Sequence, residues 1–401
     1  MLIEIILAII LGISAGIITG LIPGIHVNLI TVIVLSFSTI LLKITDPTVI
    51  AIFIISLAIT HSFLDALPSI YLGAPDAGQE LNVLPGHRLL HKGEGHNAII
   101  YTVIGSFGCL ILCILLFPVF VMLMKIIAPF MKNIVGYLLA IIMIFMIARE
   151  KRKWAKSLTV FLLAGVLGLL VLTGIPNLNQ PLFPLLSGLF GFSLLIVSLT
   201  QNAKIPEQKE KPLQLKKKTA VKAISAASSV GFIAAFLPGF GNSQAAIAAT
   251  QVVGDIGDSG FLSLVGGINT ANMVLSIGTV YMLDKARNGA IVGVKNLLGT
   301  VNLQQTITFL FVALIVGSIA TILTIKLSKI FAKNITKVNY GAIIWCILIF
   351  ITTLTFFFDG IIGILILLTA TSLGLVTTYW KIGKNHLMGC LILPVILFFL
   401  L

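Results

Sequence analysis

Runs of about 20 apolar residues recur along the whole chain, from Leu2 to the final Leu401. A helix needs about this length to cross the hydrocarbon core of a bilayer, and helices satisfy their own backbone polar groups there. Hydrophobic residues make up 58% of the 401 residues and charged residues only 10%, which leaves too little polar material to cover a soluble surface. The sequence therefore predicts an all-α polytopic integral protein of the cell membrane, with membrane lipids as its surroundings.

The candidate membrane segments divide into two sets around a polar stretch near the midpoint. The first set lies near 2–22, 25–42, 48–72, 98–124, 133–148, 158–174 and 186–200. The second set lies near 223–237, 240–253, 261–283, 297–325, 339–358, 359–379 and 385–401. Residues 201–222 between them carry seven Lys, a composition that cannot enter hydrocarbon. We therefore expect about 10 to 14 membrane segments in two halves, 1–200 and 223–401, joined by a solvated cytoplasmic linker.

The two halves carry similar sequences around a Pro-Gly pair. GIITGLIPGIHVNLI (16–30) aligns without a gap with GFIAAFLPGFGNSQA (231–245). A second pair follows in the same order, LHKGEGHNAI (90–99) with LDKARNGAIV (283–292). Such self-similarity predicts an internal repeat. Because Pro and Gly interrupt helices, each Pro-Gly pair predicts a broken or re-entrant helical hairpin.

Basic residues predict how the halves lie in the membrane. The clusters at 149–156, 201–222, 326–337 and 381–384 can all face the cytoplasm, as Lys- and Arg-rich short loops do. Because each half has an odd number of segments, the loop 88–96 then falls inside and the loop 284–295 outside. The halves therefore have opposite orientations. This distribution accounts for the net charge of +13 without a nucleic-acid partner, since no basic domain with interleaved aromatic residues occurs.

Inverted halves with interrupted segments at matching positions are typical of secondary transporters, whose substrate lies where the broken helices meet. Helix N-termini at such breaks favour anions. The candidate substrate-binding residues are those at and just after the two breaks: Pro23, Gly24, His26, Asn28, Pro238, Gly239, Gly241, Asn242, Ser243 and Gln244. The alternative is a pair of simple Pro kinks whose polar groups are satisfied by neighbouring helices.

A second polar element follows in each half. Asp65 interrupts an apolar run, where an ionisable residue costs roughly 2.5 to 3.5 kcal/mol and is a functional candidate by default. His61 precedes it by four residues, on the same helical face, so the two can form a proton-linked pair. Asn269, Thr270 and Asn272 follow a Gly pair in the second half. We predict that these five residues bind a coupling ion, H⁺ or Na⁺, with no other cofactor; the alternative for Asp65 is a helix cap at the membrane interface.

Three stretches of the chain resemble the TctA family, the large membrane permease subunit of tripartite tricarboxylate transporters. They are GLIPGIHVNL near the start, GAPDAGQELNVLPGHRLLHKGEGHNAII after the third segment, and FLPGFGNSQAAIAA in the second half. The resemblance implies that the two Pro-Gly pairs form the breaks around a carboxylate site. It also implies a small membrane subunit and an extracytoplasmic binding protein as partner classes. His26 and Asn28 stand where the family has small residues, which indicates a divergent branch, with an archaeal one as a candidate.

The sequence thus predicts a secondary active transporter for a small organic anion rather than an enzyme. Two alternatives stay open at this stage: a lipid-linked phosphate flippase or membrane scaffold, and an intramembrane transferase that uses His61 and Asp65. No P-loop, GxSxG or HExxH motif occurs in the sequence. Transport driven by ATP would therefore need a separate subunit.

Overall fold

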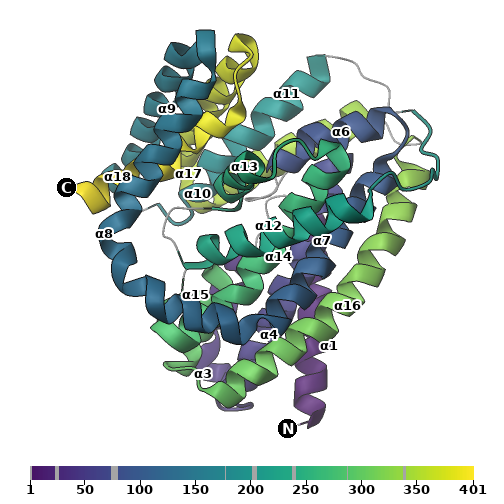
Figure 1. Cartoon of the computed structure of the whole chain (residues 1–401), viewed down its shortest axis with the longest axis vertical. Helices are drawn as coiled ribbons and strands as arrows, with labels where there is room; N and C mark the ends of the chain where they lie inside the picture. The colour runs from purple at the N-terminus through teal and green to yellow at the C-terminus, as the bar shows by residue number, and fades with distance from the viewer. Residues whose placement is uncertain are drawn as a thin grey trace.

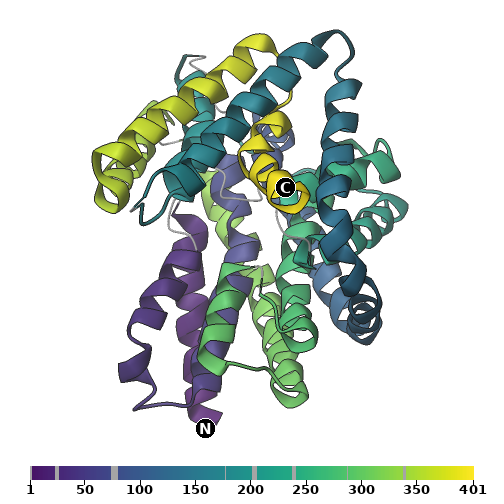
Figure 2. The same ribbon diagram turned by 90° about the vertical axis from the view of Figure 1, so that its left-hand side faces the viewer.

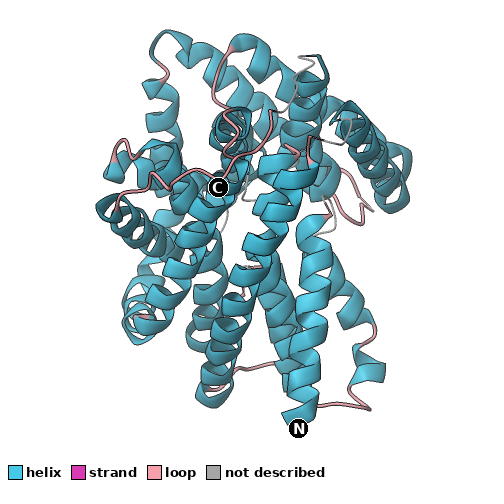
Figure 3. Ribbon diagram, turned by 90° about the vertical axis from the view of Figure 1, so that its right-hand side faces the viewer, coloured by secondary structure: helices cyan, strands magenta, loops and turns pink. Residues whose placement is uncertain are grey.

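The computed structural model describes residues 2–22, 27–73, 80–176, 178–200, 206–236, 241–286, 288–336 and 340–401. Every regular element within these ranges is a helix, as the three views in Figure 1, Figure 2 and Figure 3 show. Seven helical segments of the described chain are long and apolar enough to cross a bilayer, and five shorter apolar segments accompany them. The predicted class of a helical, polytopic membrane protein is confirmed.

The helices are labelled in chain order in Figure 1. The longer ones are α1 (Leu2–Leu21), α4 (Pro47–Leu64), α7 (Gly95–Leu115), α8 (Phe117–Arg149), α9 (Trp154–Leu169), α12 (Lys217–Phe236), α14 (Gly257–Leu283), α16 (Leu303–Asn334) and α17 (Tyr340–Trp380). The shorter α-helices are α2 (Val27–Ser36), α3 (Ser38–Leu41), α5 (Ala66–Tyr71), α6 (Val83–His91), α10 (Leu182–Leu186), α11 (Ser193–Thr200), α13 (Asn242–Val253), α15 (Gly289–Leu298) and α18 (Gly389–Leu400). Five further short helical segments are η1 (Glu80–Asn82), η2 (Lys151–Lys153), η3 (Leu170–Gly174), η4 (Ser187–Phe192) and η5 (Lys384–Met388).

The first half opens with a helical hairpin that lies beside α4. Figure 2 shows α1 rising from the N-terminus to the middle of the molecule and the chain returning to the same end through α2 and α3. Gly12 of α1 lies against Ser56 of α4, and Gly20 lies against Leu64, so α1 and α4 run in the same direction. Small residues at four-residue spacing let two helix backbones approach closely. The hairpin is therefore held against α4 along the length of α1.

The second half repeats this arrangement with α12, α13 and α14. Gly260 of α14 lies against Thr219 of α12, and Gly231 of α12 lies against Ala271 of α14. These two helices therefore also run in the same direction. In each half the Pro-Gly pair lies between the first helix and the second in the sequence, and a long helix then packs along the first.

Contacts with α16 and α7 determine how these two sets are oriented. Thr48 accepts a hydrogen bond from Gln305 at the start of α4 and α16, and Tyr71 donates to the backbone oxygen of Ser328 near the end of α16. Helix α5 continues α4, so α4 and α5 both run in the same direction as α16. His96 at the start of α7 meets the Ser328 hydroxyl at 2.9 Å, and Leu110 later in α7 lies against Gly317 earlier in α16, so α7 runs opposite to α16.

The helix α14 runs in the same direction as α7. Ser263 near the start of α14 donates to the backbone oxygen of Tyr101 at 2.8 Å, and Gly278 near its end lies against Phe117, just after α7. Since α4 runs opposite to α7, α4 and α14 run in opposite directions. Their companions α1 and α12 do the same. This is the geometry that a pair of inverted halves requires.

The second aligned sequence pair does not occupy matching places in this order of helices. Residues 90–99 join α6 to α7, whereas residues 283–292 join α14 to α15. In the sequence of elements, α15 takes the place of α6 and α16 the place of α7. The Pro-Gly alignment is the pair that fits the order of the helices.

The predicted boundaries around residue 124 are wrong. The sequence places segments at 98–124 and 133–148, but α7 ends at Leu115 and α8 runs without interruption from Phe117 to Arg149. Pro118 lies in the first turn of α8, where its missing N–H leaves no hydrogen bond unmade and its fixed φ suits a helix start. The apolar run therefore contains a helix start that hydropathy does not mark.

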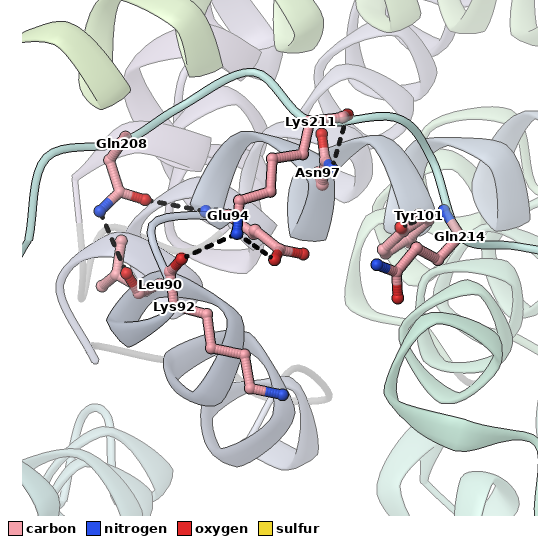
Figure 4. Close-up of polar contacts among 9 residues, drawn as sticks. Leu90, Lys92, Glu94, Asn97, Tyr101, Gln208, Lys211 and Gln214 are labelled. Carbon is pink, nitrogen blue, oxygen red and sulfur yellow. Dashed lines mark hydrogen bonds and ion pairs between the residues drawn. The ribbon is translucent and has the colours of Figure 1, made fainter.

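The predicted linker is partly helical, and its described residues before that helix are bound to the first half. Helix α12 begins at Lys217, within the stretch that the sequence assigns to the linker. Residues 206–216, named the strap here, lie along the junction of α6 and α7 (Figure 4). The backbone N–H of Lys209 donates to the oxygen of Gly93 at 2.8 Å, and the Gln208 side chain accepts from the N–H of Gly95 at 2.8 Å.

Side chains add to this attachment. Lys211 donates to the carboxylate of Glu94 at 2.8 Å, and Glu94 keeps only 10% of its side chain exposed (Figure 4). Further along, the N–H of Gln214 donates to the hydroxyl of Tyr101 at 2.9 Å. The strap is mostly exposed and is hydrogen-bonded at successive points to α6 and α7.

Helix α17 bends sharply at Gly360, where φ is 60°. This is the boundary between the predicted segments 339–358 and 359–379. The carboxylate of Asp359 accepts from the backbone N–H groups of Asn179 and Gln180 at 2.6 and 3.0 Å. The bend is therefore tied to the chain that precedes α10.

Candidate functional site

A polar pocket of about 230 Å³ lies between the two hairpins, α4 and α14. Its first-half lining consists of Val27, Asn28, Ala58, His61, Ser62 and Asp65. Its second-half lining consists of Asn242, Asn269, Asn272, Met273, Asn288 and Gly289. Five side-chain amides, one imidazole and one carboxylate thus meet inside a largely apolar bundle. The pocket brings together the helices that follow the two Pro-Gly breaks, because Asn28 lies in the first turn of α2 and Asn242 begins α13.

Asp65 lies at the bend between α4 and α5. Its backbone N–H still bonds to the oxygen of His61 at 2.9 Å, but its side chain points into the pocket and only 2% of the residue is exposed. Asn269 donates to its carboxylate at 2.9 Å. Asp65 therefore lies at a helix end, where the alternative prediction of a helix cap placed it. Its carboxylate is nevertheless buried and lines the pocket. A buried carboxylate needs such donors to offset its lost hydration.

A chain of amides extends from this carboxylate through α14 and α13. Asn242 donates to the Asn269 oxygen at 2.8 Å, and Asn272 donates to the Asn242 oxygen at 2.6 Å. Ser276, one turn after Asn272, donates to the backbone oxygen of Asn272 at 2.7 Å and lies 3.3 Å from its amide oxygen. These bonds link the helix start after the second break to Asp65 in the first half.

His61 connects the pocket to α1. Its Nδ1 lies 3.2 Å from the hydroxyl of Thr19, which in turn bonds to the backbone oxygen of Gly16 at 3.3 Å. His61 and Asp65 both line the pocket, as their four-residue spacing predicts. Thr19 is a site neighbour that the sequence analysis missed, since a Thr in an apolar helix carries no distinctive signal.

The start of α15 closes one side of the pocket. The Asn288 oxygen accepts from the N–H of Ala290 at 3.0 Å and caps this helix. A Cβ atom placed on Gly289 would lie 2.2 Å from the Asn28 oxygen, so a larger residue there would displace the Asn28 side chain. Asn288 and Gly289 were missed by the sequence analysis, and their only signal is the pattern of a helix N-cap.

The family model described as "Tripartite tricarboxylate transporter TctA family" matches residues 6–389. The chain belongs to the TctA family. An uncharacterized protein of Methanocaldococcus jannaschii is 31% identical over 358 residues, which cover 87% of this chain and 88% of that protein. Comparison with solved structures gives no match. The resemblance is confirmed, and the archaeal relative is consistent with an archaeal branch.

The TctA family is a family of transporter permeases and not of enzymes. The transferase alternative is therefore excluded, and the chain is a multi-pass membrane permease. Among the described residues no group of three or more His, Cys, Asp or Glu could hold a metal ion.

The remaining predicted site residues of this TctA-family chain fall into two groups. Pro23, Gly24, His26, Pro238 and Gly239 lie outside the described residues. Gly241 is the N-cap of α13, Ser243 and Gln244 lie in its first turn, and Thr270 is buried in α14 without being a lining residue. The structure thus brings six predicted residues to one pocket: Asn28, His61, Asp65, Asn242, Asn269 and Asn272.

Proposed function

We propose that this TctA-family permease is a secondary active transporter that moves a small carboxylate across the cytoplasmic membrane, coupled to H⁺ or Na⁺. The observation that carries the proposal is the pocket. It is lined by the first turns of the two helices that follow the Pro-Gly pairs, α2 and α13, and by the carboxylate of Asp65. Amide N–H groups and helix N-termini suit a carboxylate substrate. A buried Asp suits a proton or a cation. One pocket therefore offers both partners of a coupled transport cycle.

Alternating access of two inverted halves, 1–200 and 223–401, would expose this pocket to each side in turn. The opposite directions of α4 and α14 support this part of the proposal, because inverted halves can exchange conformations around a fixed central site. The basic loops support the opposite orientations of the two halves. Arg88 pairs with Asp258 at the start of α14, whereas Lys295 pairs with Asp284 at its end, so the loops 88–96 and 284–295 lie at opposite ends of one helix.

The partners of the permease follow from its family. The TctA family works in a tripartite system with a small membrane subunit and a binding protein. We propose the same classes of partner for this chain. No contact among the described residues specifically favours a lipid head group as the substrate, so the flippase alternative has no observation to carry it.

Uptake into proteoliposomes tests the proposal. Radiolabelled citrate and succinate should accumulate when an inward Na⁺ or H⁺ gradient is imposed. Asp65→Asn should abolish the dependence on the gradient, and Asn242→Ala should raise the KM. Ser318→Ala provides a control, because this hydroxyl bonds to the backbone of its own helix, α16, outside the pocket. Absence of gradient-driven uptake in the unaltered protein, or normal uptake by both pocket variants, would refute the proposal.

A further inference from the structure

The amide chain of the pocket has a defined polarity. An ionised carboxylate can only accept hydrogen bonds, so the Asn269 amide must present its Nδ2 to Asp65, as the 2.9 Å contact has it. Its oxygen is then turned toward Asn242 and accepts from that amide at 2.8 Å. The same reasoning fixes Asn242, whose oxygen accepts from Asn272 at 2.6 Å. The charge of one carboxylate therefore sets the orientation of three amides on two helices.

Neutralising the carboxylate reverses this requirement. A protonated Asp65 can donate through its new O–H, and Na⁺ held by the carboxylate attracts a second oxygen; either change favours the oxygen of Asn269 over its nitrogen. Rotating the Asn269 amide presents its Nδ2 to Asn242, which must then turn its own oxygen toward Asn269. The Asn272 amide can follow because its neighbour Ser276 carries a hydroxyl that donates or accepts. The chain therefore has two patterns of hydrogen bonds, one for each state of Asp65, and the second gives up the 3.3 Å bond from Asn269 to the backbone oxygen of Ser62.

We propose that Asn269 is the positioning residue that couples the ion-bound state of Asp65 to the broken helix α13. This inference rests on the proposed function, in which Asp65 binds the coupling ion. Asn269 is suited to the role because it bonds to Asp65 on one side and to Asn242, the first residue of α13, on the other. The reversal changes which atom Asn242 presents at the pocket, and so changes the pocket's affinity for an anion. His61 is the only other titratable group among the described lining residues, which come from α2, α4, α13, α14 and α15.

The experiment separates coupling from binding. In proteoliposomes, gradient-driven accumulation of citrate is measured beside counterflow exchange of citrate, which needs substrate binding and alternating access but no ion gradient. Asn269→Leu keeps a side chain of similar size and removes the amide. We expect accumulation to fall about tenfold further than exchange does, within the range of ordinary coupling energies. Asn272→Leu breaks the same chain one link later and should give a smaller loss in the same direction.

A double variant gives a second measurement. Asp65→Asn and Asn269→Leu act on one chain, so combining them should reduce accumulation no further than Asp65→Asn alone. If the unaltered protein accumulates citrate under a gradient and both Leu variants still do so normally, the inference fails while the proposed function stands. Equal losses of exchange and accumulation in both Leu variants would assign these residues to binding and would also overturn it. Absence of gradient-driven uptake in the unaltered protein would overturn both.

Discussion

Replacing Gly105 by Ala should weaken the contact between α7 and α14. A Cβ atom at Gly105 would lie 1.8 Å from the backbone oxygen of Ser263, and this contact must lengthen to at least 3.0 Å to be tolerable. Because the opposing atom belongs to a helix backbone, α14 has to move as a body. Overpacking of a core typically costs about 1 to 3 kcal/mol, and the better helix propensity of Ala returns less than about 1 kcal/mol. We expect a net loss of stability of about 1 to 2 kcal/mol.

The same displacement should reach the pocket. Ser263 precedes Asn269 on α14 by six residues, so a shift of this helix lengthens the 2.9 Å hydrogen bond between Asn269 and Asp65. Gradient-driven uptake should therefore fall together with thermal stability. Gly191→Ala is the matched control, because no atom lies within 4 Å of a Cβ at that position.

Two measurements on detergent-purified and reconstituted protein decide the outcome. Thermal unfolding, monitored by size-exclusion chromatography, compares the stabilities of the two Ala variants with that of the unaltered protein. Citrate uptake into proteoliposomes compares their activities. If Gly105→Ala is as stable as Gly191→Ala and transports normally, the close approach of α7 and α14 does not exist in the membrane and the reasoning is wrong.

Two further predictions concern groups outside the pocket. Burial, and to a smaller extent the charge of His91, lowers the pKa of His87 in α6 to about 4 from its usual 6.5. The folded protein therefore favours the neutral imidazole. Its contribution to stability, up to about 3 kcal/mol, is fully present above pH 6.5 and is lost as the pH falls toward 4. His87→Gln should flatten that loss, and equal slopes of unfolding temperature against pH for the two proteins would contradict it. In the strap, Lys211→Glu should set two carboxylates together at Glu94, lower stability by about 1 to 2 kcal/mol and speed cleavage of residues 206–216 by a glutamyl endopeptidase. Lys209→Glu adds the same cleavage site but keeps the backbone bond of Lys209, so equal cleavage of both variants would show that the ion pair does not hold the strap.

The sequence located much of the pocket because its signals are local. The breaks at the two Pro-Gly pairs pointed to Asn28 and Asn242, and an ionisable residue within an apolar run pointed to Asp65. Asn288 escaped notice because it lies in a polar connection that reads as an ordinary loop, and Thr19 because it lies in an apolar helix. Both reach the pocket region only through packing, by the approach of α15 to α2 and of α1 to α4.

Some helix boundaries could likewise be predicted from the sequence and others could not. The bend at Gly360 was foreseen, because Asp359 and Gly360 interrupt an apolar run. The junction of α7 and α8 was not, because Leu116 and Phe117 are as apolar as their neighbours and only Pro118 marks the new helix. Hydropathy reports where a chain can cross a membrane, and it does not report where one helix ends and the next begins within an apolar run.

The sequence by itself determined that this protein is a helical membrane permease of the TctA family. That result depends on the composition of each segment and on short motifs, which are properties of neighbouring residues. Only the tertiary structure decided which polar groups meet. The bond from Asn269 to Asp65 joins residues 204 positions apart, and it exists because α4 and α14 run in opposite directions and close-packed glycines such as Gly105 set the distance between helices. Such contacts depend on the relative placement of whole helices, which no local pattern of residues encodes.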